Sequence, residues 1–244
     1  MRRLASVLLA GAVAAVAVAA ALDAIFSEEP APRPSSAEQR LRATGVAGEL
    51  VWSDDLCRGY SVALPSLARR DFPSVGCRVF TRDSLGVTGG EIVWLARPDP
   101  GGTTVVLSRK AVALEVGDDF RPVDAVWLGG LRYAAVFDGP RMVVALFDGD
   151  SAFLLTHVPG WTDVRLRASP SGSYFAIQSA GGALDVRDRE GRRLPMPRTG
   201  QAIAWSPDER FAAVAAGGAV SILPAEGGGE LARLPIAAGD LDWR

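Results

Sequence analysis

Residues that could carry out chemistry are few in this sequence and widely spaced. His157 is the single histidine among 244 residues. A serine–histidine–aspartate triad would have to use it, and a zinc site built mainly from histidines cannot be assembled. Its setting in LLTHVPG, after an apolar run, is typical of the end of a β-strand.

Three acidic groups could bind a cation or act as an acid–base pair. They are Asp54 with Asp55, Asp118 with Asp119, and Asp148 with Asp150 across Gly149. The last group has too few oxygen ligands for a calcium loop, and nothing in the sequence fixes the carboxylate separation that acid–base chemistry requires. We therefore interpret all three as turns. We assign no catalytic residue, no metal site and no cofactor, and predict that the protein is not an enzyme.

Signals for binding phosphates are also absent from the sequence. The glycine-rich stretch AEGGGE at 225–230 lacks the Lys-Ser/Thr ending of a P-loop and a following helix, which indicates a loop between strands. The 26 basic residues are mixed with 28 acidic ones, for a net charge of −2, and form no basic face. We therefore expect no nucleic-acid partner.

Cys57 and Cys77 are the only two cysteines, 20 residues apart. In an oxidising compartment such a pair predicts a disulfide, which would stabilise the fold by about 3 kcal/mol on the chain-entropy model. The alternative is two buried free thiols.

The N-terminus predicts a membrane segment. Residues 1–3 carry two arginines, and residues 4–22 carry no charge, which is just long enough for a helix to cross a bilayer. The arginines should stay in the cytoplasm, so the rest of the chain lies outside. We favour an uncleaved signal anchor and a single-pass cell-membrane protein. The alternative is a signal peptide cleaved after Ala19, Ala21 or Ala24, giving a secreted or periplasmic protein.

Between this segment and the remainder of the chain the composition changes. Residues 23–47 contain Pro30, Pro32 and Pro34 among charged and small polar residues. This composition predicts a flexible, semi-extended tether and places the folded domain at residues 48–244.

A short motif recurs in the second half of the chain. AWSPDERFAAV at 204–214 and RASPSGSYFAI at 167–177 both place Ser and Pro in a turn before an apolar run. Aligning Ala168 with Trp205 gives a period of 37 residues, and Trp127 and Trp243 extend the series by 41 and 38 residues. Phe80 is the corresponding position of a more diverged copy. The residues assigned a structural role at the repeat turns are Trp52, Trp127, Ser169, Pro170, Gly172, Trp205, Ser206, Pro207, Asp208 and Trp243.

The rest of each period predicts further β-strands. RYAAVFDG, RMVVALFDGD and SAFLLTHV follow Trp127, SYFAIQSAGG, ALDVRDREG and RRLPM follow Ala168, and three similar runs follow Trp205. Each period therefore predicts four strands. Because 16 prolines and 27 glycines leave little room for long helices, we expect an all-β chain.

The Trp-Ser-Pro-Asp turn at 205–208, its partial copy at 169–172 and the strand runs between them resemble TolB-like and WD-repeat-like β-propeller repeats. The resemblance covers residues 46–244 and implies four-stranded blades arranged in a ring. Counting first strands gives five blades, and the alternative is six, with EIVWLARP around Trp94 opening an extra unit. We expect Leu241–Arg244 to pair beside Glu49–Ser53 and close the ring. Glu209 departs from the pattern, because it stands where the repeat has glycine.

An anchor, a tether and a broad loop surface predict a membrane-tethered extracytoplasmic module that binds a protein partner at or near the membrane. The alternative is a small-ligand or sugar-binding protein, or an enzyme, that uses the central channel. Arg165, Arg167 and Asp242 on the first strands are the candidates for lining that channel.

Overall fold

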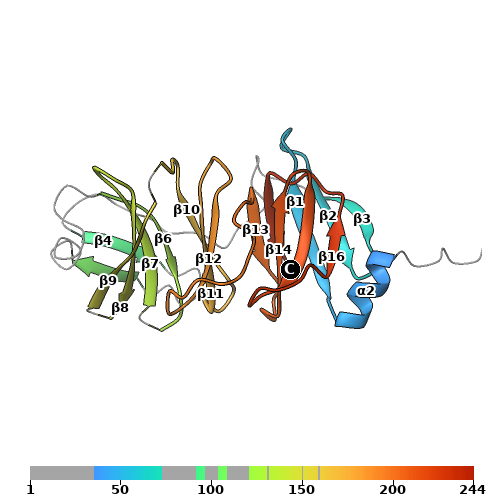
Figure 1. The fold of residues 1–244 in the computed structure, drawn as a ribbon, viewed down its shortest axis with the longest axis horizontal. Coiled ribbons are helices and arrows are strands. Elements are labelled where there is room, and N and C mark those ends of the chain that lie inside the picture. Colours follow the sequence, from blue (N-terminus) through green and yellow to red (C-terminus); the bar gives the residue numbers. More distant parts are fainter. Residues whose placement is uncertain are drawn as a thin grey trace, which may run out of the picture. The chain divides into compact units, whose positions relative to one another are not determined.

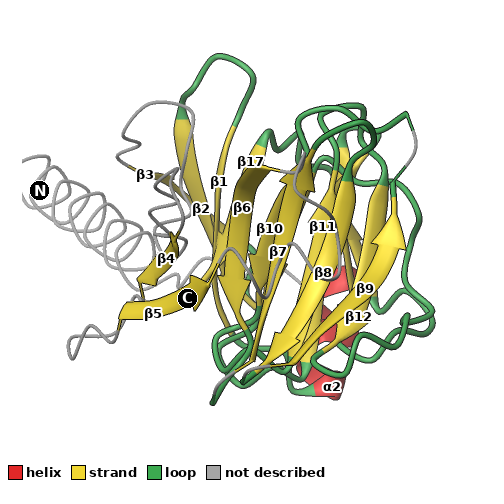
Figure 2. Ribbon diagram, turned by 90° about the vertical axis from the view of Figure 1, so that its left-hand side faces the viewer, coloured by secondary structure: helices red, strands yellow, loops and turns green. Residues whose placement is uncertain are grey.

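The computed structural model describes residues 36–72, 92–96, 104–108 and 121–244, with 131, 150 and 159 left out of the last range. These residues form five antiparallel sheets and one α-helix (Figures 1 and 2), so the all-β prediction is confirmed for them. Sheet 1 contains β17 (Asp240–Trp243), β1 (Gly48–Ser53), β2 (Gly59–Leu64) and β3 (Ala68–Phe72), and sheet 2 contains β4 (Ile92–Ala96) and β5 (Thr104–Ser108). Sheet 3 contains β6 (Arg121–Trp127), β7 (Arg132–Asp138), β8 (Val143–Asp148) and β9 (Ser151–His157). Sheet 4 contains β10 (Arg165–Ala168), β11 (Tyr174–Gln178) and β12 (Leu184–Asp188), and sheet 5 contains β13 (Ala202–Trp205), β14 (Phe211–Ala216), β15 (Ala219–Pro224) and β16 (Ala232–Leu234).

The middle strands of sheets 3 and 5 contain continuous runs of buried apolar residues instead of alternating buried and exposed ones. In β7, β8 and β14, five consecutive residues are buried. A strand needs apolar side chains on both faces only when another layer covers each face. One apolar cluster joins sheet 3 to sheet 4, a second joins sheet 4 to sheet 5, and a third joins sheet 5 to sheet 1. The core therefore consists of layers between successive sheets.

The repeat in the sequence is also a repeat in the structure. At the end of four first strands, one residue donates its N–H to a carbonyl oxygen at the start of the second strand, at 2.8–2.9 Å: Leu128 to Arg132, Ser169 to Tyr174, Ser206 to Phe211, and Arg244 to Glu49. The residues immediately before these donors are Trp127, Ala168, Trp205 and Trp243. The four residues aligned from the sequence therefore precede equivalent backbone hydrogen bonds in the structure.

Both Ser-Pro turns use the serine in the same way. The hydroxyl oxygen of Ser169 accepts the N–H of Tyr174, and that of Ser206 accepts the N–H of Phe211, each at 3.0 Å. Asp208 accepts a hydrogen bond from the Ser206 hydroxyl at 2.6 Å, which holds the second turn more firmly. The serine side chain thus fixes the register of the hairpin at the turn.

Gly172 allows two consecutive turns to touch. Its φ is +76°, and an added Cβ would lie 2.4 Å from Cα of Leu128 in the turn of sheet 3. Gly182 has a similar φ of +78°, but an added Cβ there meets nothing within 4 Å.

We expect Gly172→Ala to destabilise the domain considerably more than Gly182→Ala. Both variants incur the cost of a side chain at positive φ, about 1 kcal/mol, and only Gly172→Ala adds overpacking of roughly 1–3 kcal/mol. Urea unfolding monitored by tryptophan fluorescence measures both free energies of unfolding. Equal losses in the two variants would show that contact between the turns is unimportant.

The first and last described strands pair as the sequence predicts. β17 lies antiparallel to β1, with Leu50 opposite Trp243 and Ser53 opposite Asp240. Leu241 and Trp243 are fully buried, and the indole N–H of Trp243 donates to the carbonyl oxygen of Ala47 at 3.1 Å. Sheet 1 is therefore built from both ends of the domain.

Part of the predicted tether is instead folded. Residues Ser36–Thr44 form the helix α2, which lies beside β16 (Figure 1) and buries Leu41 completely. The guanidinium of Arg40 donates to the carbonyl oxygen of Leu231 at 3.0 Å. The sequence SAEQRLRAT is rich in helix-favouring residues, and Leu41 supplies an apolar contact that a free tether would not need. The compact unit therefore begins at Ser36 rather than at residue 48.

Sheet 4 has three strands, and the fourth strand predicted at RRLPM is absent. Residues 193–199 run beside β12 but make only two isolated bridges to its chain segment, at Arg193 and Thr199. Pro195 and Pro197 have no N–H to donate, so a regular ladder cannot form there. Trp52 also lies outside the repeat turns: it sits in β1, the second strand of sheet 1, opposite Leu241.

Several predictions fall outside the described residues. They concern residues 1–35, Cys77, Phe80, Asp118 with Asp119, and Asp150. Trp94 lies in β4, but the preceding residues 73–91 are not described, so the choice between five and six units is not decided there. Among the described residues, no helix has the length and apolar character needed to cross a membrane.

Candidate functional site

Side chains of the first strands meet at one place in the described domain. Arg167 of β10 donates to the carbonyl oxygen of Leu241 in β17 at 3.1 Å and forms an ion pair with Asp240. The side chains of Arg167 and Asp240 are 17% and 8% exposed. Sheets 4 and 1, which this pair joins, both pack against sheet 5. This ion pair between a buried carboxylate and a partly buried guanidinium therefore lies where three sheets converge.

Two alanines of sheet 5 stand at the matching places in β13. Ala202 corresponds to Arg165 and Asp240, and Ala204 corresponds to Arg167 and Asp242, in the alignment set by the turns. Both alanines are buried. Sheet 5 therefore carries no charged side chain at these two places of its first strand.

Asp124 braces the first strands of sheets 3 and 4. Its carboxylate accepts the N–H of Leu166 in β10 at 2.7 Å and that of Ala125 at 2.9 Å. Burial raises the pKa of Asp124 above its usual value, and the two backbone hydrogen bonds offset part of this effect. The β6 and β10 strands belong to different sheets and share no backbone ladder, so the Asp124 side chain supplies a hydrogen bond between them.

A polar pocket of about 350 Å³ opens beside these strands. It is lined by Asp163, Arg165, Arg167, Gln178, Ser179, Ala180, Gln201, Gly239 and Asp240. Gln178, one of these residues, is only 7% exposed. A primary amide that lines a pocket can donate and accept hydrogen bonds there. The charged and amide side chains together make this pocket the candidate binding site.

The three predicted channel residues divide between two environments. Arg165 and Arg167 line the pocket, and Arg165 keeps 55% of its side chain exposed. Asp242 is buried instead and accepts the N–H of Trp243 and the guanidinium of Arg244, both at 2.9 Å. Gln178 and Gln201 were not predicted, because neither belongs to a motif.

Comparisons with known proteins identify no family. No family model matches the chain, and no curated protein matches it. Among solved structures, the chain is similar to a computationally designed protein, Ika8, with 14% identity and a TM-score of 0.38 over 74% of this chain and 57% of that chain. It is also similar to the β-propeller domain of Myceliophteria thermophila Cps50 (Swd1), with 12% identity and a TM-score of 0.36 over 80% of this chain and 73% of that domain.

The predicted acidic turns have structural roles. Asp54 accepts the N–H groups of Leu56 and Arg58 within the loop that joins β1 to β2. Burial raises the pKa of Asp54, but hydrogen bonds and the charge of Arg58 outweigh this and lower it. Asp148 ends β8 and pairs with Arg132 at 2.8 Å. Among the described residues, no group of three or more His, Cys, Asp or Glu could hold a metal ion.

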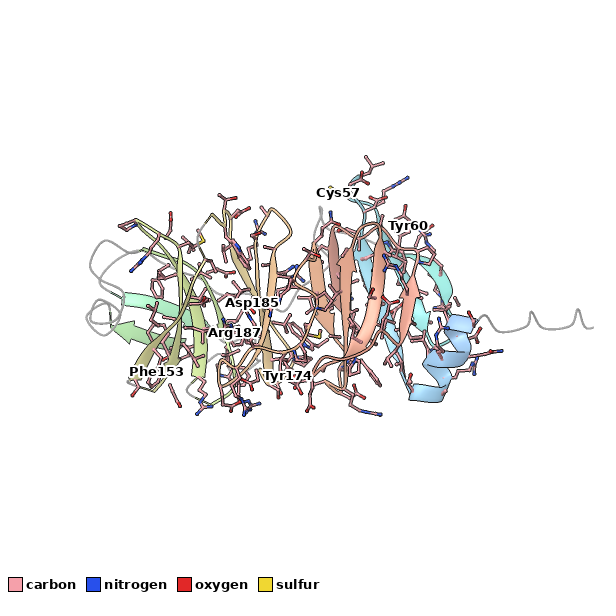
Figure 3. The ribbon with its side chains drawn as sticks, in the orientation of Figure 1. Cys57, Tyr60, Phe153, Tyr174, Asp185 and Arg187 are labelled. Atoms are coloured by element: carbon pink, nitrogen blue, oxygen red, sulfur yellow. The ribbon has the colours of Figure 1, made fainter. Side chains whose placement is uncertain are left out.

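The remaining predicted features lie in loops or at strand ends. His157 is the last residue of β9, as predicted, and residues 225–230 lie in the connection between β15 and β16. Cys57 lies in the loop between β1 and β2 (Figure 3). Its predicted disulfide with Cys77 stays a prediction, because Cys77 is outside the described residues.

Sheet 4 contains a second charged cluster, centred on Asp185 (Figure 3). This buried carboxylate accepts from the guanidinium groups of Arg187 at 3.0 Å and Arg193 at 2.6 Å. Burial raises the pKa of Asp185, but the two arginines outweigh it and lower the pKa overall. The Arg187 guanidinium also donates to the carbonyl oxygen of Gly191 at 2.7 Å. These contacts hold residues 191–193 against β12, where the regular fourth strand is missing.

Glu209 links the turn of sheet 5 to the turn of sheet 4. It adopts a φ of +56°, at the position where the sister turn has Gly172. Its carboxylate accepts hydrogen bonds from the N–H and, at 2.7 Å, from the hydroxyl of Ser171. The departure from glycine therefore exchanges backbone strain for a contact between neighbouring repeats.

We expect Glu209→Gln to reduce the pH dependence of stability. Partial burial raises the pKa of Glu209, but hydrogen bonds from Ser171, Ser173 and Ser169 outweigh it and hold the pKa below its usual value. A folded-state pKa below the unfolded one stabilises the fold above the unfolded pKa, and this stabilisation is lost as pH falls through the folded pKa.

The measurement is the free energy of unfolding of wild type and Glu209→Gln between neutral and acidic pH. We expect a difference of about 1 kcal/mol at neutral pH, after allowance for solvent screening, that vanishes in acid. Glu226→Gln, a change at an exposed glutamate of the β15–β16 loop, is the control. Parallel profiles for wild type and Glu209→Gln would contradict the proposed contact.

Proposed function

We propose that the chain is a membrane-tethered extracytoplasmic β-propeller of five blades that acts as a protein-interaction module. The observation that carries the propeller is the Arg167–Asp240 ion pair. Sheet 5 packs between sheet 4 and sheet 1 through apolar clusters, yet the Arg167 side chain of sheet 4 reaches Asp240 of sheet 1. First strands that surround a common axis explain this contact, because they approach one another at the centre of a ring.

Pairing of β17 with β1 supports closure of the ring. The strand β17, from the end of the chain, takes the first place in sheet 1, beside β1, β2 and β3 from the start of the domain. The edge of β1 that would otherwise be unpaired is therefore covered. Contact between β4 and β6 supports a place for sheet 2 beside sheet 3. Five sheets in this order support five blades.

Location outside the cytoplasm is supported by the sequence of residues 1–22. Two arginines precede nineteen uncharged residues, which is the arrangement of a signal anchor. The remaining tether is residues 23–35, because α2 belongs to the folded unit. The domain would therefore be held close to the membrane that it is anchored in, and its partner would be a protein at or near that membrane.

A protein-interaction role is supported by the pocket beside the first strands. It is open, polar and lined by residues from several loops and strands, including the largely buried Gln178. Loops presented by a rigid sheet scaffold are common binding surfaces.

Site-specific photocross-linking in the native membrane tests the proposal. A benzophenone amino acid placed at Gln201, an exposed residue of the pocket, should capture one membrane or extracytoplasmic protein. The same probe at Phe153, an exposed residue of β9 (Figure 3), is the control. Identical products from both positions, or capture of no protein at Gln201, would reject the interaction module and favour a small ligand in the pocket.

A further inference from the structure

A second pocket adjoins the polar one at Asp163. It has a volume of about 550 Å³ and is formed by the β7–β8 turn and the loop between β9 and β10. Its apolar lining comes from Pro140, Met142, Val158 and Trp161, and Asp163 lines both pockets. We define the two together as the loop groove. It has an apolar end at Trp161 and a polar end at Gln178.

Trp161 is only partly buried in the loop groove. It packs against the apolar cluster between sheets 3 and 4 and still lines the pocket. A tryptophan held by packing on one side and accessible on the other contributes contact area at little entropic cost, as residues that dominate binding interfaces do. The apolar end therefore suits one apolar side chain of a partner.

Charges in the polar end balance. The lining contains two carboxylates, Asp163 and Asp240, and two guanidinium groups, from Arg165 and Arg167. A bound phosphate would be repelled by the carboxylates, and a bound cation would be repelled by the guanidinium groups. Gln178 and Gln201 each offer an amide N–H₂ and an amide carbonyl. A peptide bond presents the complementary pair, one acceptor and one donor. This combination favours a peptide backbone over an ion.

We propose that the loop groove binds an extended peptide segment of the partner protein, with an apolar side chain against Trp161 and main-chain amide groups against Gln178 and Gln201. This inference rests on the proposed interaction function and specifies where and how the partner binds. The exposed guanidinium of Arg165 and the carboxylate of Asp163 lie between the two ends and restrict which residues the peptide can carry there.

Selection from a random nonapeptide phage library against the purified full-length protein in detergent tests the inference. The enriched peptides are synthesised with a fluorescent label, and their affinities are measured by fluorescence anisotropy. We expect them to share one apolar residue at a fixed position. We also expect Trp161→Ala and Gln178→Leu each to weaken binding at least tenfold, and Phe153→Ala to leave binding unchanged.

Gln178→Leu separates binding from folding. Leucine is similar in size to glutamine, so replacing this pocket-lining amide leaves no cavity and should keep Tm close to the wild-type value while binding is lost. A lower Tm together with weaker binding would show a structural role and overturn the assignment. Enriched peptides whose affinity is the same for wild type, Trp161→Ala and Gln178→Leu would also overturn it, as would binding of glycans but no peptides.

Cross-linking from Gln201 distinguishes failure of this inference from failure of the proposed function. If the same partner is captured by wild type and by the Trp161→Ala and Gln178→Leu variants, the interaction module stands and the loop groove is not its binding site. If neither a protein partner nor a peptide is found, both proposals fall.

Discussion

Deletion of residues 240–244 is expected to leave the domain without a cooperative unfolding transition. It removes β17, whose Leu241 and Trp243 are 0% and 1% exposed, and leaves one edge of β1 unpaired. Truncating one such side chain typically costs about 2–5 kcal/mol, and whole domains are stable by only about 5–15 kcal/mol. Loss of both side chains together with a strand therefore removes most of the available stability.

A graded series at Trp243 controls for nonspecific effects of the deletion. Trp243→Phe keeps an aromatic ring in the core but loses the hydrogen bond to Ala47, so we expect a loss of about 1–2 kcal/mol. Trp243→Ala should cost about 3–5 kcal/mol. Differential scanning calorimetry and near-ultraviolet circular dichroism measure the series. A deletion variant with wild-type Tm would disprove the closing role of β17.

Arg167→Met is expected to cost about 3–5 kcal/mol of folding free energy. The variant removes a guanidinium from beside the carboxylate of Asp240, whose side chain is 8% exposed. Removing one partner of a buried ion pair destabilises a protein far more than replacing both partners by apolar residues, because the remaining charge keeps its desolvation penalty. The loss should appear in urea unfolding as a lower midpoint with an unchanged slope.

A double-mutant cycle shows whether this cost belongs to the pair. The double variant Arg167→Met/Asp240→Leu replaces both charges by apolar groups, so it should be more stable than either single variant. Arg165→Met, at a side chain that is 55% exposed beside the same pocket, is the matched control and should cost less than about 1 kcal/mol. Additive losses in the double variant would show that the two residues do not interact across the first strands.

Local turn chemistry made much of the fold predictable. The Ser169 and Ser206 side chains form the hydrogen bonds that define their hairpins. The repeated serines in the sequence therefore correspond to repeated hydrogen bonds in the structure. Pairing of β17 with β1 could be inferred because each end of the domain carries an incomplete repeat unit. The C-terminal end has a first strand with no later strands, and the N-terminal end has later strands with no first strand. Both inferences depend on features that are local in sequence.

Other features depend on contacts that sequence letters do not show. The interaction of Arg167 with Asp240 requires that two strands 73 positions apart meet across a third. Gln178 occupies an ordinary strand in the sequence, and only its burial beside the pocket identifies it. Two misses had visible signals: Pro195 and Pro197 argued against a fourth strand in sheet 4, and the run SAEQRLRAT favoured helix over tether.

Sheet 1 also has a consequence for the order of folding during synthesis. β1 is among the first parts of the domain to leave the ribosome, whereas β17 follows every other described strand. Until β17 arrives, β1 keeps an unpaired edge, and the apolar contacts that Leu241 and Trp243 supply to the core are missing. Partly exposed edges and apolar surfaces are the parts of nascent chains that aggregate and that chaperones protect. The domain can therefore complete its fold only after the last strand is translated, and a chaperone that covers β1 in the meantime would raise its yield.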